Sequence, residues 1–344
     1  GNILNISEEG LPTYKPFSAK VLEKLKLDIP PACPPSNKTI TFTHEPLLPL
    51  EIPPASRIGL PYTIGRLPPQ CCVFGECKPC CSPPECTPKT KVAPVLLIHG
   101  HAISRDSAAD FSLEGFNKIQ SRLEQDGILN IGTVSAYTQK ESGPEGAIAA
   151  DTSLSIRISY YFDIFKEPEN YVVAQAKSES IDTYAVRLKE LIALVKEKTG
   201  SDKVSLIGFS MGGLVARRYL QIFGTEGVEN LILIGTPNKG IAGDALSYCP
   251  LLGEQLECRD MQADSLFIRK LNAGRVPEIP ITNIYGAGCP MENSTGDGIV
   301  LVEHAAIPFG KNIQINGSCA SVVRPLHIEL LDVEKFPELY ESVY

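Results

Sequence analysis

The stretch Lys203–Leu220, KVSLIGFSMGGLVARRYL, decides how this chain folds. It begins with apolar and β-branched residues, turns at Gly208–Gly212, and continues with the apolar spacing of a helix. The turn reads G-x-S-x-G, with Ser210 at its centre. Glycine on both sides of the serine lets the backbone pass where a Cβ would collide with neighbouring chain. The pattern therefore predicts a strand, a tight turn and a helix that hold a serine hydroxyl at the end of the strand.

Predicted strands and helices alternate on both sides of this stretch. Further strands are expected at residues 92–98, 132–137, 156–162, 228–234, 281–287 and 312–316. Helices are expected at residues 116–125, 180–198 and 264–271, and at 328–343 with a break at Pro337. Ser178 or Ser180 can cap the helix at 180–198, and Gly200 ends it. This alternation predicts an α/β fold, with a mostly parallel central sheet and helices on both faces.

Composition limits the classes of function. The chain has 344 residues, 43% of them hydrophobic, which suffices for one large domain and an appendage. The formal net charge is −8 and no basic run is present, so we expect no nucleic-acid partner. No apolar run approaches the roughly 18 residues that a membrane-spanning helix requires. The remaining class is a globular protein that acts on a small molecule, a lipid or a polymer.

Residues 1–90 form a proline- and cysteine-rich N-terminal extension, distinct from the predicted catalytic domain at 91–344. They contain 17 of the 28 prolines and seven of the 11 cysteines. A short helix at 18–27 and a strand at 38–44 are the regular elements expected there. The extension is either a separate binding module, a linker, or a segment that packs over the catalytic domain.

Cysteine usage indicates an oxidising compartment. Cys71–Cys86 holds six cysteines in 16 residues, which fits either a small disulfide knot or a zinc knuckle using Cys77 and Cys80. Adjacent cysteine pairs, interleaved prolines and the absence of a nearby histidine favour disulfides. Two further pairs are expected, Cys249 with Cys258 and Cys289 with Cys319. We therefore expect an extracellular or cell-surface protein, whose signal or anchor is not present in this chain.

A serine hydroxyl becomes a useful nucleophile when a base removes its proton and a third group orients that base. The chain has five histidines, and in a strand–turn–helix serine hydrolase the order is serine, acid, histidine. Asp297 follows the strand at 281–287, and His327 follows the last strand, so both belong at the same sheet edge as Ser210. His304 competes for the role of base, but it is only seven residues past Asp297, and no strand lies between the two to bring it back over Ser210.

Two backbone N–H groups should stabilise the oxyanion of a tetrahedral intermediate. One is that of Met211, the residue after the serine. The other should come from the loop after the strand at 92–98, where His101 is the first candidate and Ala102 the second. The imidazoles of His99 and His101 can be purely structural. Residues 238–275 lack sheet-like patterning and form either a lid over the serine or an ordinary surface connection.

At this point the sequence resembles a known superfamily. LLIHGH, LIGFSMGGLVARRYL, LILIGTPNKG, GDGIV and LHIELL occur in the order found in α/β-hydrolases, and they resemble most the lipase/esterase branch (triacylglycerol lipase-like). MQADSLFIRKLN is similar to the segment after the lid of microbial lipases. The resemblance covers residues 92–344 and implies Ser210, Asp297 and His327 as the catalytic triad, with His101 and Met211 at the oxyanion hole. Residues 1–91 match nothing that we recognise.

The expected activity is hydrolysis of a carboxylic ester through an acyl-enzyme intermediate, without a cofactor or metal. The substrate would be a small-molecule, lipid or polymer ester, and peripheral contact with a membrane or lipid surface is compatible with this class. An acyltransferase, a thioesterase or an amidase would use the same residues. A non-catalytic binding protein of the same fold is a further alternative, disfavoured because all three triad candidates are present.

Overall fold

The computed structural model describes residues 4–6, 12–14, 70–73, 76–79, 93–101, 113–134, 153–166, 171–174, 179–243, 247, 249, 255–291, 294–319 and 325–343. The chain divides into two compact units, residues 1–63 and residues 64–344. In the first unit, β1 (Leu4–Ile6) pairs antiparallel with β2 (Pro12–Tyr14). The helix expected at 18–27 and the strand expected at 38–44 lie outside the described residues, as does His44.

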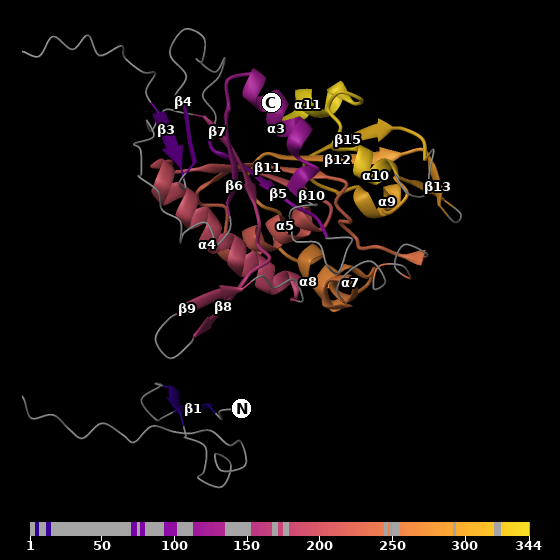
Figure 1. The fold of residues 1–344 in the computed structure, drawn as a ribbon. Coiled ribbons are helices and arrows are strands. Elements are labelled where there is room, and N and C mark those ends of the chain that lie inside the picture. The colour runs from indigo at the N-terminus through magenta and orange to yellow at the C-terminus, as the bar shows by residue number, and fades with distance from the viewer. Residues whose placement is uncertain are drawn as a thin grey trace, which may run out of the picture. The chain divides into compact units, whose positions relative to one another are not determined.

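The second unit is built on a seven-stranded sheet with the order β15-β12-β11-β10-β5-β7-β6, seen in Figure 1. Every pairing in this sheet is parallel. The strands are β5 (Val95–Ile98), β6 (Leu129–Val134), β7 (Leu154–Ile158), β10 (Val204–Phe209), β11 (Val228–Ile234), β12 (Ile281–Ala287) and β15 (Lys311–Asn316). The parallel sheet expected from the sequence is confirmed.

Helices cover both faces of the sheet, because successive side chains of each buried strand point to opposite faces. In β5, Leu96 and Ile98 join a core packed by α4 (Ile181–Thr199) and α5 (Met211–Phe223). Val95 and Leu97 join a second core with α3 (Asn117–Gln125), α10 (Leu326–Glu329) and α11 (Pro337–Val343). The apolar runs of the central strands are explained by burial on both faces.

The local signals at α4 act as the sequence predicts. Ser180 is the N-cap, and its Oγ accepts a hydrogen bond from the Thr183 backbone N–H at 3.3 Å. Gly200 ends the helix with φ 64°, in the left-handed region that glycine adopts without steric cost. Tyr184, Leu188 and Leu191 on its inner face are buried.

The strand expected at 156–162 is shorter than predicted. β7 ends at Ile158, and Tyr160, Tyr161 and Phe162 follow as irregular chain that is buried all the same. Their apolar run resembles a strand, but the rings of Tyr160 and Tyr161 pack against His99, the residue that follows β5. The antiparallel hairpin of β8 (Asp163–Lys166) and β9 (Tyr171–Ala174) comes next and was not expected.

Short elements complete the unit. Hairpins are formed by β3 (Gln70–Val73) with β4 (Glu76–Pro79), and by β13 (Cys289–Met291) with β14 (Ser294–Gly296). The remaining helices among the described residues are α7 (Gln255–Met261), α8 (Leu266–Asn272) and α9 (Val302–Ala305). Among the described residues, no helix is long and apolar enough to cross a membrane.

The two expected disulfides, Cys249–Cys258 and Cys289–Cys319, are both present. They are consistent with an oxidising compartment. The cysteine-rich stretch 71–86 is described only as the backbone of the β3–β4 hairpin, so the choice between a disulfide knot and a zinc knuckle stays open.

Candidate active site

The tight turn at Ser210 joins the central strand β10 to α5. Ser210 has φ 52°, which is unfavourable for a side chain with a Cβ, and it is held there by its N–H, which donates to the Ile234 carbonyl at 2.8 Å. A Cβ on Gly212 would lie 2.3 Å from the Ile98 carbonyl oxygen and 2.4 Å from that of His99. The glycine in the G-x-S-x-G pattern is therefore required by the neighbouring end of β5.

Three side chains predicted from the sequence lie in one hydrogen-bonded chain. The Nε2 atom of His327 is 2.9 Å from Oγ of Ser210, and its Nδ1 atom is 2.7 Å from Oδ2 of Asp297. All three residues are buried: Asp297 is fully buried, and Ser210 is 8% exposed. With a proton on Nδ1, the imidazole can donate to Asp297 and accept the serine proton at Nε2.

The loop after β14 fixes the orientation of Asp297. Its Oδ1 atom accepts the backbone N–H groups of Ile299 at 3.0 Å and Val300 at 2.7 Å. Oδ2 is thereby left facing His327, whose own backbone N–H donates to the Asp297 carbonyl at 2.8 Å. The aspartate loop and the start of α10 therefore act as one structural unit.

The expected oxyanion donors lie on two segments beside Ser210. Met211 is the first residue of α5, so its N–H has no acceptor one turn earlier within the helix. Gly100, the residue before His101, is so close to the turn that a Cβ there would lie 2.9 Å from Cβ of Ser210. Ala102, the second candidate, lies outside the described residues.

Two of the remaining histidines have structural surroundings. His304 has its Nδ1 atom 3.0 Å from the Gly240 carbonyl oxygen, away from the chain formed by Ser210, His327 and Asp297. His99 is fully buried and stacks on Tyr160 at a ring-centroid distance of 4.1 Å. Burial lowers the pKa of His99 to about 4, so this imidazole is neutral at physiological pH.

The His101 ring belongs to a polar cluster that sequence reasoning missed. Its Nδ1 atom contacts Oε2 of Glu257 on α7. The same carboxylate accepts hydrogen bonds from two tyrosine hydroxyls, that of Tyr161 at Oε2 and that of Tyr184 at Oε1. Glu257 is 1% exposed. A glutamate in a seven-residue helix is ordinarily a surface residue, and only its apolar neighbours Leu256 and Cys258 indicate burial in the sequence.

One group of atoms has the composition of a metal site. Nε2 of His101 and the sulfurs of Cys249 and Cys258 lie within 4.8 Å of one another, which is unique in the part of the chain that the structure describes. The two sulfurs are bonded to each other. A disulfide lacks the thiolate charge that binds a metal, so the oxidised protein does not have a metal site here.

The segment expected to be a lid or a surface connection contains α7 and α8. Arg217 of α5 binds both ends of this segment. Its guanidinium donates to Asn238 Oδ1 at the start, at 2.9 Å, and to Asn272 Oδ1 near the end, at 2.8 Å. Burial lowers the pKa of Arg217 to about 10. Asn238 also donates to Asn283 of β12 at 3.0 Å. Both ends of the segment are thus fixed to the sheet and α5, whichever role its middle has.

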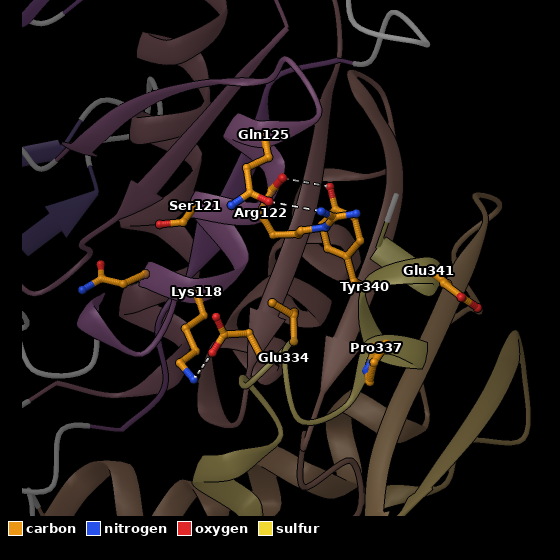
Figure 2. A pocket seen from close by; sticks show the side chains of 10 residues that line it. Lys118, Ser121, Arg122, Gln125, Glu334, Pro337, Tyr340 and Glu341 are labelled. Atoms are coloured by element: carbon orange, nitrogen blue, oxygen red, sulfur yellow. Dashed lines mark hydrogen bonds and ion pairs between the residues drawn. The ribbon is translucent and has the colours of Figure 1, made fainter.

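A separate groove of about 530 Å³ lies between α3 and α11, shown in Figure 2. None of its lining residues belongs to the Ser210 site. Its cations are already paired: Lys118 contacts Asp332 at 2.8 Å and Glu334 at 2.7 Å, and Arg122 lies over the Tyr340 ring at 5.0 Å. The groove therefore has no part in the arrangement of Ser210, His327 and Asp297.

Fold and site together define a protein of the α/β-hydrolase fold. Residues 94–273 match the model of the palmitoyl protein thioesterase family, and this match spans more than half of the chain. The chain belongs to the palmitoyl protein thioesterase family.

Several solved structures are similar to this chain at low identity. The product of the gene lin2722 from Listeria innocua is 19% identical, with 73% of this chain and 92% of that chain covered and a TM-score of 0.44. The mature lipase BlEst2 from Bacillus licheniformis is 13% identical, with coverages of 74% and 94% and a TM-score of 0.46. A putative cell surface hydrolase from Lactobacillus plantarum is 17% identical, with coverages of 74% and 97% and a TM-score of 0.41. No curated protein matches the sequence.

Proposed function

We propose that the chain hydrolyses acyl thioesters and carboxylic esters through an acyl-enzyme formed on Ser210. The observation that carries this proposal is the hydrogen-bonded chain of Ser210, His327 and Asp297, with contacts of 2.9 and 2.7 Å. Membership of a thioesterase family supports the same reading, because a thioester and an oxyester pass through the same tetrahedral intermediate.

In this mechanism, His327 Nε2 takes the proton of Ser210 as Oγ attacks the acyl carbonyl. Asp297 holds the proton on Nδ1 and stabilises the imidazolium that forms. The C–S or C–O bond then breaks, and His327 returns the proton to the departing sulfur or oxygen. Water, deprotonated by the same imidazole, attacks the acyl-enzyme and releases the carboxylic acid, which regenerates Ser210.

The oxyanion of each tetrahedral intermediate would be held by the N–H groups of Met211 and His101. Met211 N–H lies at the start of a 13-residue helix, where the helix dipole also favours negative charge. His101 lies directly after Gly100, whose close approach to Ser210 supports this assignment. Both donors are backbone groups, so substitution of either side chain does not remove the N–H itself.

The leaving group separates thioesters from oxyesters. A thiol has a pKa near 8.5, far below that of an alcohol, so a thiolate can leave with little help from a general acid. Thioester turnover should therefore depend less on proton return from His327 than oxyester turnover does. The family name directs us to long-chain acyl thioesters as the first substrates to examine.

We further propose that the protein works outside the cytosol, since two disulfides hold its catalytic domain. Long-chain acyl groups are carried by lipids and lipidated proteins, so peripheral contact with a lipid surface is part of the same proposal.

The test compares palmitoyl-CoA, an S-palmitoylated peptide and p-nitrophenyl esters of rising chain length. Wild type, Ser210→Ala and Ser294→Ala are assayed side by side, because Ser294 is an exposed serine of β14 and serves as a matched control. We expect Ser210→Ala to lose all measurable turnover and fluorophosphonate labelling, while Ser294→Ala equals wild type. Equal activity of wild type and Ser210→Ala would reject the proposal. Added alcohol acceptors distinguish hydrolysis from acyl transfer.

A further inference from the structure

The buried carboxylate of Glu257 has three hydrogen-bond partners and no place in the reaction described above. Tyr184 donates to Oε1, while Tyr161 donates to Oε2 at 3.3 Å and His101 Nδ1 contacts the same oxygen. A buried ionised group without such partners would destabilise the fold by several kcal/mol. The cluster is therefore built around this one side chain.

The three partners come from three different segments. His101 follows β5, Tyr161 follows β7, and Tyr184 lies in the first turn of α4. Burial and the charge of Glu257 raise the pKa of Tyr184, which keeps its hydroxyl protonated as a donor. One carboxylate on α7 thus joins the loop beside Ser210 to the body of the domain.

The His101 ring is held on both sides. Its Nδ1 atom faces Glu257, and its Nε2 atom lies 4.0 Å from each sulfur of the Cys249–Cys258 disulfide. Cys258 is the residue after Glu257, so the disulfide also braces the helix that carries the carboxylate. The ring is 12% exposed and has little freedom to move.

A fixed ring fixes the backbone that carries it. The loop before His101 is in contact with the nucleophile turn, since a Cβ on Gly100 would lie 2.9 Å from Cβ of Ser210. An oxyanion donor must lie within a few tenths of an ångström of its working position. Anchoring the His101 side chain is a direct way to hold its N–H in place.

We propose that Glu257 is a positioning residue, which holds His101 so that its backbone N–H points at the oxyanion. This inference rests on the proposed function, and it assigns to the α7 segment a role in stabilising the transition state. Because the N–H acts mainly on the developing oxyanion, loss of Glu257 should lower kcat and leave KM nearly unchanged.

The test measures kcat, KM and the affinity for a trifluoromethyl ketone, which binds serine hydrolases as a tetrahedral adduct. In Glu257→Leu, which has no acceptor, we expect kcat and inhibitor affinity to fall by about 100-fold with KM within twofold. In Glu257→Gln, whose amide can still bind the ring, the loss should be about 10-fold or less. His101→Ala keeps the backbone N–H but removes the anchor, and should resemble Glu257→Leu.

Asp260→Asn is the matched control on the same helix. Its carboxylate accepts the Ile181 backbone N–H at 3.0 Å and has no hydrogen bond to His99, Gly100 or His101, the described residues of the His101 loop. It should lower the melting temperature and leave kcat within twofold of wild type. The double variant Glu257→Gln/His101→Ala should equal His101→Ala alone, because residue 257 is proposed to act on catalysis only through the His101 ring, which the double variant lacks.

The outcomes separate the two proposals. If Ser210→Ala loses activity but Glu257→Leu and His101→Ala keep wild-type kcat, the positioning role is wrong and the proposed function stands. If Glu257→Leu does not fold, the kcat values of His101→Ala, Glu257→Gln and their double variant test the positioning role. Additive losses of kcat in the double variant would overturn the inference. If Ser210→Ala is as active as wild type, both proposals fall together.

Discussion

Nε2 of His327 lies 2.9 Å from Oγ of Ser210, although 117 residues separate them in the chain. The sheet explains this closeness. Ser210 follows β10, and His327 follows β15, with β11 and β12 between the two strands. All four strands are parallel, so their carboxyl ends meet at one edge, where Asp297 also arrives after β12. This relationship leads to the first prediction.

Asp297→Asn should lower kcat by about 10⁴-fold. The asparagine oxygen can still accept the N–H groups of Ile299 and Val300, which leaves its NH₂ group facing His327. An NH₂ group there favours the tautomer with the proton on Nε2, which cannot accept a proton from Ser210. Turnover of a p-nitrophenyl ester measures the loss, with Asp264→Asn, an exposed aspartate at φ 62°, as the control. Activity within tenfold of wild type would contradict the role of Asp297.

Gly212→Ala should destabilise the protein by about 3 kcal/mol or more, because the new Cβ meets backbone carbonyls at 2.3 and 2.4 Å. Gly213→Ala instead meets the side chain of Thr236, whose Oγ1 atom would be 1.9 Å away. Thr236→Ala should therefore partly restore the stability of Gly213→Ala and leave that of Gly212→Ala unchanged. Urea denaturation of the two single and two double variants checks this, and equal restoration in both would be the contrary result.

Stability should fall as the pH drops from about 6.5 to about 4, in part because of His99. Burial lowers its folded-state pKa from 6.5 to about 4, so over this range the unfolded chain binds the proton more tightly. The full effect is about 3 kcal/mol, present above pH 6.5 and lost towards pH 4. His99→Gln should have a shallower dependence of unfolding free energy on pH than wild type. Parallel curves for the two proteins would show that His99 does not titrate this way.

The two disulfides should contribute different amounts to the free energy of unfolding. Their cysteines are 9 residues apart for Cys249–Cys258 and 30 apart for Cys289–Cys319. Loop-closure entropy then gives about 2.6 and about 3.6 kcal/mol respectively. The double alanine variant of each pair, studied by urea denaturation at equal ionic strength, should follow that order. The reverse order would mean that packing of the Cys249–Cys258 pair against His101 outweighs chain entropy.

The fold could be predicted from the sequence because strands and helices are indicated by local patterns of apolar residues and glycines. β11 and β12 have the predicted bounds, since each carries buried aliphatic residues and is followed directly by a glycine with positive φ, Gly235 and Gly288. Ser210, Asp297 and His327 were found from chain order and from the small number of histidines. The three do lie together, while their catalytic roles stay predictions for the experiments above.

The burial of Glu257 and the end of β7 could not be predicted, because both depend on contacts between residues that are far apart in the sequence. Glu257 and His101 are 156 residues apart, and a glutamate in a short helix does not reveal that it is buried. Tyr160 and Tyr161 extend an apolar run, so they read as strand, but tertiary packing against His99 bends the chain there. The sequence pattern therefore predicts the end of β7 wrongly, because packing against the loop after β5 sets where this strand ends.

The order of the sheet also has a consequence for biosynthesis. The strand that carries the nucleophile turn is complete at Phe209, but the imidazole arrives only with the segment after β15. A ribosome-bound chain that has already folded β5, β10 and β11 has a serine without a base. The proposed activity thus begins only after the last strand has joined β12, so a chain that is still being synthesised is not yet a working enzyme.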